Sequence, residues 1–263
     1  MEVISLDFLE SINLEILVQL SANSLGLVDR AGNTWEVHND IWSAEENDFI
    51  NQGITWSIQG RFPDTYVIDC NANKWYSCNK TFILPYNEKW FIYLWSYKTD
   101  FTDYDVILGG SNAKYYSLQN KDGEYADSIG MRIEGQGYSI KSLTPQETYK
   151  WIHYYIDCNG SGTFSLYING EIQQRLTRKQ DIIFKSLNLG AWSYGTCKEG
   201  SAGFIDDFII AKGEQMYTTD SFEIPNEKFS ISLFNRIIDK SNKYVLVGKI
   251  PENQLLYNIF IHS

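Results

Sequence analysis

Neighbouring carboxylates are the side chains of this sequence whose types and spacing come closest to catalytic chemistry. A glycosidase holds two of them about 5–10 Å apart across a sugar ring. An E-x-D-x-x-E run on one strand would place such a pair on one face of a sheet, and the chain lacks that run. In the adjacent pair Asp206–Asp207, one side chain would point inward and the other outward. We therefore predict that both are structural, with one of them bound to loop backbone in preference to a metal ion, and that the protein is not an enzyme.

The sequence contains none of the spaced motifs that usually mark a metal site or a catalytic nucleophile. The three histidines form no H-E-x-x-H pair, and the four cysteines fit no C-x-x-C zinc pattern. There is no G-x-S-x-G elbow and no phosphate-binding glycine loop. The run D-F-T-D-Y-D, with Asp100, Asp103 and Asp105, is better explained as a solvated turn than as a calcium site. The sequence predicts no catalytic residue, no metal ligand and no cofactor, and it leaves a structural calcium ion open.

Aromatic residues in two loop-like segments are the candidates for ligand or partner binding. Aromatics make up 15% of the chain, and most of them fit a β-sheet core. Trp192 and Tyr194 lie in a glycine-bounded turn over 190–195, and Trp75–Tyr76 lies in a polar segment between two cysteines. Such rings stack on sugars or anchor protein interfaces. The alternative is that they only cap the ends of a sandwich.

Charge and hydropathy exclude two classes of partner. The net charge is −11, with 33 acidic and 22 basic residues, which disfavours nucleic acids and anionic membranes. No run approaches the ~18–20 apolar residues of a membrane helix, so membrane insertion is not expected. The N-terminus lacks the basic region of a secretory signal, so we expect synthesis and folding in a reducing cytoplasm. The cysteines are then thiols, although pairing of Cys70 with Cys78 in an oxidising medium stays open.

Short strands are the elements that must position these residues. Residues 163–170 alternate polar and apolar side chains and end in Asn169–Gly170, which predicts a two-residue hairpin turn. Residues 89–96 are almost continuously apolar, as in a central strand covered on both faces. Residues 151–157 and 204–211 are further strand candidates. Helical spacing over residues 6–20 is the exception, and an extended arm followed by a strand fits that segment equally well.

Several segments together resemble concanavalin A-like, laminin-G-like domains of the kind common in bacteriophage tail and other virion proteins. Residues 203–225 are similar to the closing signature of that family, although Ile209 stands where an arginine is usual and Gln215–Met216 where Ala-Arg is usual. Residues 29–35 resemble the early D-x-x-G-x-x-W turn. The other matching segments are 90–95, 151–153 with 164–170, and 186–190.

The resemblance implies an all-β jelly-roll sandwich of two antiparallel sheets over residues 25–228. Residues 1–24 would be a docking arm and residues 229–263 a β-rich extension. Both ends are rich in apolar side chains, so we expect them to pack on other virion proteins or on copies of this chain, in a homo-oligomer such as a trimer.

The function expected from this resemblance is that of a non-enzymatic virion protein. It would be a tail- or head-fibre adhesin or a decoration subunit that binds a host-surface glycan or another virion protein. It would be made in the host cytoplasm without a signal peptide. The alternative is a carbohydrate-binding module of a bacterial surface or secreted protein. A glycoside hydrolase is a third reading, against which the missing carboxylate run counts.

Overall fold

A computed structural model describes residues 14–23, 26–38, 56–57, 66–70, 74–98, 106–110, 116–120, 129–133, 139–143, 145–191, 203–213 and 220–221. Within these ranges all the regular secondary structure is β-strand, and the strands pair in antiparallel fashion. The described chain is therefore all-β, as the sequence predicts. It contains no helix of the length and hydrophobicity needed to cross a bilayer.

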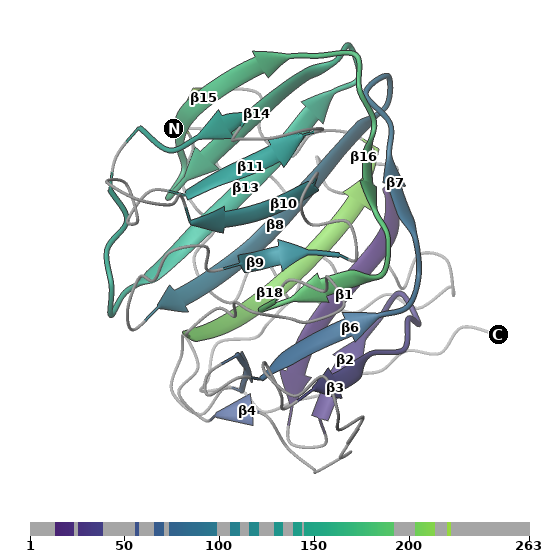
Figure 1. The fold of residues 1–263 in the computed structure, drawn as a ribbon, viewed down its shortest axis with the longest axis vertical. Coiled ribbons are helices and arrows are strands. Elements are labelled where there is room, and N and C mark those ends of the chain that lie inside the picture. The colour runs from purple at the N-terminus through teal and green to yellow at the C-terminus, as the bar shows by residue number, and fades with distance from the viewer. Residues whose placement is uncertain are drawn as a thin grey trace, which may run out of the picture.

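The larger sheet has nine strands (Figure 1). Seven of them follow one another in the order β15 (Glu171–Thr177), β14 (Thr163–Ile168), β13 (Trp151–Asn159), β8 (Lys89–Lys98), β18 (Gly203–Lys212), β1 (Glu15–Asn23) and β2 (Gly26–Asp29). The other two are β5 (Val67–Asp69), which pairs with β18, and β4 (Trp56–Ser57), which pairs with β5.

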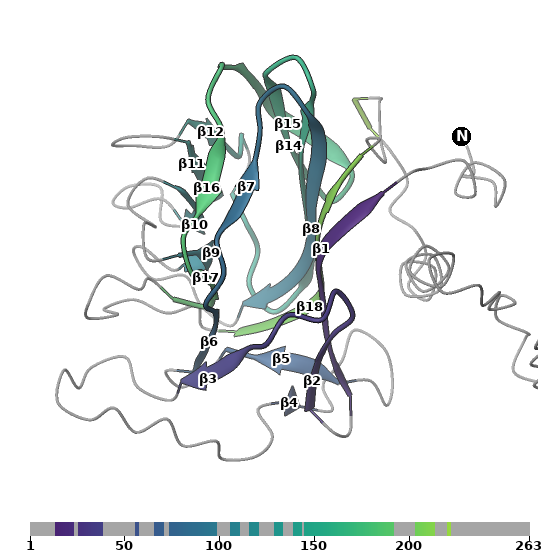
Figure 2. The ribbon, with the colours of Figure 1, turned by 90° about the vertical axis from the view of Figure 1, so that its right-hand side faces the viewer.

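The second sheet has seven strands and faces the first across the core (Figure 2). Its order is β12 (Ile140–Lys141), β11 (Ile129–Ile133), β10 (Tyr116–Asn120), β9 (Val106–Gly109), β17 (Leu187–Leu189), β6 (Trp75–Cys78) and β3 (Glu36–His38). A separate pair, β7 (Phe82–Leu84) with β16 (Ile182–Phe184), carries the chain between the two sheets along one side. These connections make the structure a two-layered antiparallel sandwich.

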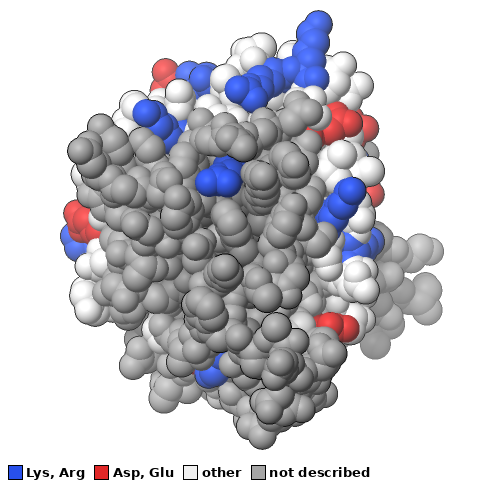
Figure 3. All heavy atoms as spheres, viewed as in Figure 1, with Lys and Arg blue, Asp and Glu red and all other residues white. Residues whose placement is uncertain are grey.

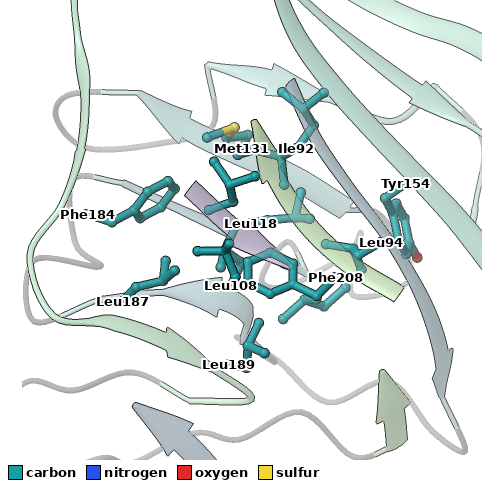
Figure 4. Close-up of a cluster of buried hydrophobic side chains, with 14 of the residues drawn as sticks. Ile92, Leu94, Leu108, Leu118, Met131, Tyr154, Phe184, Leu187, Leu189 and Phe208 are labelled. Carbon is teal, nitrogen blue, oxygen red and sulfur yellow. The ribbon is translucent and has the colours of Figure 1, made fainter. Parts of the chain in front are cut away.

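Alternating side chains from both sheets fill the space between the layers (Figure 4). On β8, Trp90, Ile92 and Leu94 point into this core and are fully buried. Leu118 and Leu189 reach it from the second sheet. This is the period-two pattern of a strand with one face toward a core. The alternate residues of β8 face the opposite side of the large sheet, which is described in the next subsection.

The carboxylate of Asp29 ties together the turn that follows β2. Its Oδ1 accepts hydrogen bonds from the backbone N–H of Gln19 (3.2 Å) and Ala31 (2.9 Å). Its Oδ2 accepts from Asn33 Nδ2 (2.9 Å) and from Trp35 Nε1 (2.8 Å). The spacing D-x-x-G-x-x-W thus has a direct physical role, because the aspartate accepts from the tryptophan six residues later.

The Asn169–Gly170 pair forms the two-residue connection that its sequence predicts. Ile168 pairs with Glu171 across the hairpin, and both turn residues have positive φ, 50° for Asn169 and 83° for Gly170. The Asn169 side chain does more than tolerate this geometry. Its Oδ1 accepts from the backbone N–H of His153 (3.0 Å). The backbone N–H of Asn169 donates in turn to the His153 carbonyl (3.0 Å). The turn therefore also fixes the neighbouring strand β13.

The N-terminal boundary differs from the sequence expectation. Residues 15–23 form β1, which lies between β18 and β2 and pairs with both. This pairing places the second half of the expected 1–24 arm inside the sandwich, because β18 needs a partner on that side. Residues 1–13 and the expected extension over 229–263 lie outside the described residues.

Three of the four cysteines are buried free thiols, and Cys197 lies outside the described residues. Cys70 and Cys78 therefore do not pair with one another. Burial raises the pKa of Cys70, and the nearby negative charge of Asp69 raises it further. Burial also raises the pKa values of Cys78 and Cys158. The thiolate, which is the reactive form, is thus disfavoured at all three positions.

Asp29→Asn should lower the free energy of unfolding by about 2–4 kcal/mol. The reason is that the amide NH₂ of asparagine would replace one carboxylate oxygen and would face N–H groups that now donate to that oxygen. Urea denaturation measures the loss. Glu36→Gln, which removes a negative charge from an exposed position on β3, is the control and should change stability by less than about 0.5 kcal/mol. Equal effects of the two substitutions would contradict the role given to Asp29.

The folded chain should resist thiol reagents at pH 8 and react after unfolding, because burial and raised pKa values suppress the thiolates. In a Cys197→Ser background, Ellman's reagent should find almost no reactive thiol without denaturant and three thiols in concentrated urea. Rapid reaction of the folded protein would show that these cysteines are not protected by burial.

Candidate ligand-binding face

The outer face of the large sheet carries an unusual concentration of aromatic side chains. Register across β18, β8 and β13 aligns these residues in four rows that run across the strands. Row 1 is Asp69, Phe204, Tyr97 and Trp151; row 2 is Asp206, Trp95 and His153; row 3 is Ile209, Tyr93, Tyr155, Tyr167 and Ile172; row 4 is Ala211, Phe91, Asp157, Ser165 and Arg175. Rings from strands far apart in the sequence thereby become neighbours.

Asp206 and Asp207 form a β-bulge that sets this register. Asp206 pairs with Trp95 and Ile209 with Tyr93, so β18 uses one residue more than β8 over this interval. Asp207 has a φ of 47°, and its N–H donates to Oδ1 of Asp206 (2.9 Å). Because of the extra residue, Ile205 faces the core before the bulge and Phe208 faces it after the bulge. Both residues are buried, and the Asp206 carboxylate accepts the N–H of the residue that follows it in the bulge.

Rows 1 and 2 contain the partly exposed rings. Tyr97 lies between Trp151 (ring centroids 5.5 Å apart) and Phe204 (6.0 Å), and all three side chains are partly exposed. Trp95 is also partly exposed, and its Nε1 donates to the Tyr93 hydroxyl (3.0 Å). The rings are held by neighbours in the sheet, so they form a pre-arranged surface.

Tyr149 is an exposed aromatic residue whose backbone lies beside these rings. Its N–H donates to the carbonyl of Lys98 (2.7 Å), which places it at the end of β8 where Tyr97 and Trp151 lie. Its side chain is 67% exposed, and its φ of 58° is rare for a residue other than glycine. Strained backbone of this kind concentrates at functional sites. We call Trp95, Tyr97, Tyr149, Trp151 and Phe204 the aromatic platform.

Two further features belong to the platform: β18 and β8 approach closely at Gly203, and an ion pair lies at the platform border. Gly203 has a φ of 146°, and a Cβ at this position would clash with the carbonyl of Tyr97, so only glycine lets β18 approach β8 here. Beside Phe204, Asp69 Oδ2 pairs with Lys74 Nζ at 3.0 Å, and both side chains keep some exposure. The platform thus has a donor and an acceptor at its border.

Most residues of rows 3 and 4 differ from the platform because they are buried, whereas Ile172 is partly exposed and Arg175 is exposed at the β15 edge. Six of their residues form a second hydrophobic cluster and are at most 2% exposed: Phe91, Tyr93, Tyr155, Tyr167, Ile209 and Ala211. Asp157 and His153 are fully buried on the same face. Burial raises the pKa of Tyr167, and the charge of Asp157 raises it further, so the phenol stays protonated at neutral pH. We call these six residues the buried outer rows.

The aromatic residues predicted from sequence lie elsewhere. Trp75 and Tyr76 belong to strand β6 instead of the expected loop. Trp75 is partly exposed and stacks on His38 with ring centroids 3.7 Å apart. Tyr76 is fully buried, and its hydroxyl donates to the Asp69 carbonyl (2.8 Å), so it supports the platform border and offers no ring to a ligand. Trp192 and Tyr194 lie outside the described residues.

The described residues include no cluster of three or more His, Cys, Asp or Glu side chains able to hold a metal ion. Asp100, Asp103 and Asp105, the residues of the candidate calcium turn, lie outside the described ranges. On the face seen in Figure 3, the basic and acidic side chains of the described residues are interspersed and form no single basic patch.

Comparison with known proteins finds similarity in three-dimensional structure and none in the sequence searches. No family model and no curated protein matches the sequence. Domain 4 of AbnA, an extracellular GH43 arabinanase from Geobacillus stearothermophilus solved with arabinotriose, is similar with a TM-score of 0.54 and 17% identity. The match covers 76% of this chain and 93% of that domain.

A second similar structure is the ligand-binding domain of botulinum neurotoxin serotype D, solved with N-acetylneuraminic acid. Its TM-score is 0.50 at 18% identity, and the match covers 87% of this chain and 52% of the toxin domain. The chain therefore spans about half the length of the toxin domain. At these identities the likeness concerns the fold alone, and it agrees with the all-β sandwich.

The bulge can be tested by two substitutions that both remove the Asp207 carboxylate. Asp207→Val should be less stable than Asp207→Gly by about 1–3 kcal/mol, because a β-branched residue is strained at this positive φ and glycine is not. Thermal and urea unfolding provide the comparison. If the valine and glycine variants unfold at the same denaturant concentration, left-handed backbone at Asp207 does not matter for stability.

Proposed function

We propose that this chain is a carbohydrate-binding domain and that its glycan lies on the aromatic platform. The observation that carries the proposal is the set of partly exposed rings at one end of the large sheet, with Tyr149 the most exposed aromatic among the described residues. Two structurally similar domains were solved with sugars, arabinotriose in one and N-acetylneuraminic acid in the other, which supports the choice of ligand class.

The chemistry of the platform fits a sugar. One face of a sugar ring presents C–H groups, which pack against the flat side of an aromatic ring. The hydroxyl groups around the ring need hydrogen-bond partners, and Asp69 and Lys74 at the platform border supply an acceptor and a donor. The net charge of −11 repels anionic ligands at long range, so we expect neutral glycans to bind more tightly than sialylated ones.

We further propose that binding takes place without hydrolysis. A glycosidase needs two carboxyl groups facing one bond. On this face Asp206 lies on β18 in row 2 and Asp157 on β13 in row 4, with β8 between the two strands. Both are buried, and Asp206 already accepts the N–H of Asp207. Their placement suits structural roles.

We also propose a biological setting and a strand connectivity for this domain. The sequence resemblance favours a virion protein that oligomerises with itself or with other virion proteins, and a bacterial surface or secreted module is the alternative. Detection of the chain in purified virions would decide between them. We also propose the jelly-roll connectivity of concanavalin A-like domains, which the two facing antiparallel sheets support and an experimental structure would test.

Titration calorimetry of the full chain with arabinotriose and with N-acetylneuraminic acid, beside a broader array of neutral glycans, tests the ligand class. We expect a neutral glycan to bind, and Trp151→Ala and Tyr149→Ala each to weaken binding at least tenfold, a loss of about 1.4 kcal/mol. Leu143→Ala is the matched control, since it removes an exposed apolar side chain just after β12 that is not part of the platform. Absence of any glycan ligand would overturn the proposed function, and unchanged affinity in both platform variants would overturn the proposed site.

A further inference from the structure

The segment that leads into β13 carries one buried polar side chain among exposed neighbours. Gln146 is 7% exposed, whereas four of the other five residues of segment 145–150 are exposed. The segment has no regular secondary structure, so a ladder of strand hydrogen bonds does not fix its backbone. Burying a side-chain amide costs free energy unless the amide forms hydrogen bonds. The burial of Gln146 therefore calls for a partner inside the sandwich.

Tyr154 supplies this partner from the core. Its side chain points between the two sheets and is 2% exposed (Figure 4). Its hydroxyl donates to Gln146 Oε1 (3.2 Å). Burial raises the pKa of Tyr154, so the hydroxyl keeps the proton that it donates. A hydrogen bond between two buried side chains thus ties segment 145–150 to β13.

A second hydrogen bond holds the segment at its strained residue. The N–H of Tyr149 donates to the carbonyl of Lys98 (2.7 Å), and the φ of Tyr149 is 58°. Only two residues separate Gln146 from Tyr149 in the chain, so the two hydrogen bonds constrain one short turn. A backbone conformation this unfavourable persists only where its surroundings hold it in place.

The ion pair in the same segment is a weaker constraint. Lys150 pairs with Glu147, and both side chains are mostly exposed to solvent. Exposed pairs of this kind contribute little, because water and salt screen the charges and two long side chains must be ordered. The hydrogen bond from Tyr154 to Gln146 is buried, and a buried polar group that loses such a bond pays the full cost of its desolvation. The buried bond is therefore the stronger anchor.

We propose that Gln146 and Tyr154 are positioning residues of the aromatic platform and act through Tyr149. They hold the backbone of Tyr149 in its bent conformation, so the backbone that carries this ring is already ordered before a ligand binds. A group that is ordered in advance loses less conformational entropy on binding. The effect on glycan affinity rests on the proposed function, in which Tyr149 contacts the glycan, whereas the effect on the backbone does not.

Hydrogen exchange at the amide of Tyr149 tests the positioning in the full chain without ligand. Tyr154→Phe removes the hydroxyl and keeps the ring in the core. NMR of protein labelled with ¹⁵N-tyrosine follows the amide, whose signal is identified by its absence from Tyr149→Phe. We expect this amide to exchange at least about tenfold faster in Tyr154→Phe than in the unsubstituted chain, because its turn opens more often. The amide of Tyr93, in the middle of β8, should keep its protection.

Tyr155→Phe is the matched control. It removes a hydroxyl from the next residue of β13, which belongs to the buried outer rows on the opposite face of the sheet. Exchange at Tyr149 should then stay within about twofold of its original rate. If Tyr154→Phe does not fold, Gln146→Met repeats the test, since methionine has a similar length and no carbonyl oxygen to accept the hydroxyl.

Calorimetric titration with arabinotriose, and with the neutral glycan of the array that binds most tightly, tests the effect on the site. Tyr154→Phe should weaken binding about threefold or more, and it should cause no further loss in a Tyr149→Ala background, because the two residues act in one chain of contacts. No loss of affinity, or equal losses with and without the Tyr149 ring, would overturn the action through Tyr149.

Two results of the exchange measurement would also overturn the positioning role. One is unchanged exchange at Tyr149 in the folded variant, and the other is an equal acceleration at Tyr93, which would mean that only global stability has changed. If no glycan binds the unsubstituted chain, the proposed function fails, and the exchange measurement by itself decides whether Gln146 and Tyr154 hold Tyr149 in place.

Discussion

The structure depends on a central strand that is apolar on both sides. Alternate residues of β8 enter two separate hydrophobic clusters, with Trp90, Ile92 and Leu94 in one and Phe91 and Tyr93 in the other. A strand of this kind is stable only if both faces of its sheet are covered. The second sheet covers one face. On the other face, the rings that stay partly exposed are the ones on which we propose that a ligand binds.

Part of this arrangement follows from local sequence patterns. The continuous apolar run over 89–96 predicts a strand covered on both faces, and the alternation before Asn169–Gly170 predicts the hairpin between β14 and β15. The face shared by Trp151, His153 and Tyr155 also follows from period two. Such features are predictable because the determining residues are a few positions apart.

The platform could not be derived in this way, because its rings come from β8, β13 and β18 and meet only through cross-strand register. That register depends on the bulge at Asp207, whose backbone geometry the adjacent acids do not reveal. The polar residues around Trp75–Tyr76 suggested a loop, whereas pairing with β3 and β17 makes the segment a strand. Similarly, β1 belongs to the sandwich because a distant strand, β18, pairs with it.

The pairing of β1 with β18 also has a consequence for the order of events during biosynthesis. Glu15 pairs with Lys212, so almost 200 residues must be made before β1 can pair with β18. β2 follows β1 directly and can pair with one of its edges at once. The opposite edge of β1 has no permanent neighbour until β18 is made, and contacts of such long sequence separation form slowly. We expect the hairpin of β13, β14 and β15, whose strands are close in sequence, to form while β1 still waits, so closure of the large sheet would be a late, post-translational step.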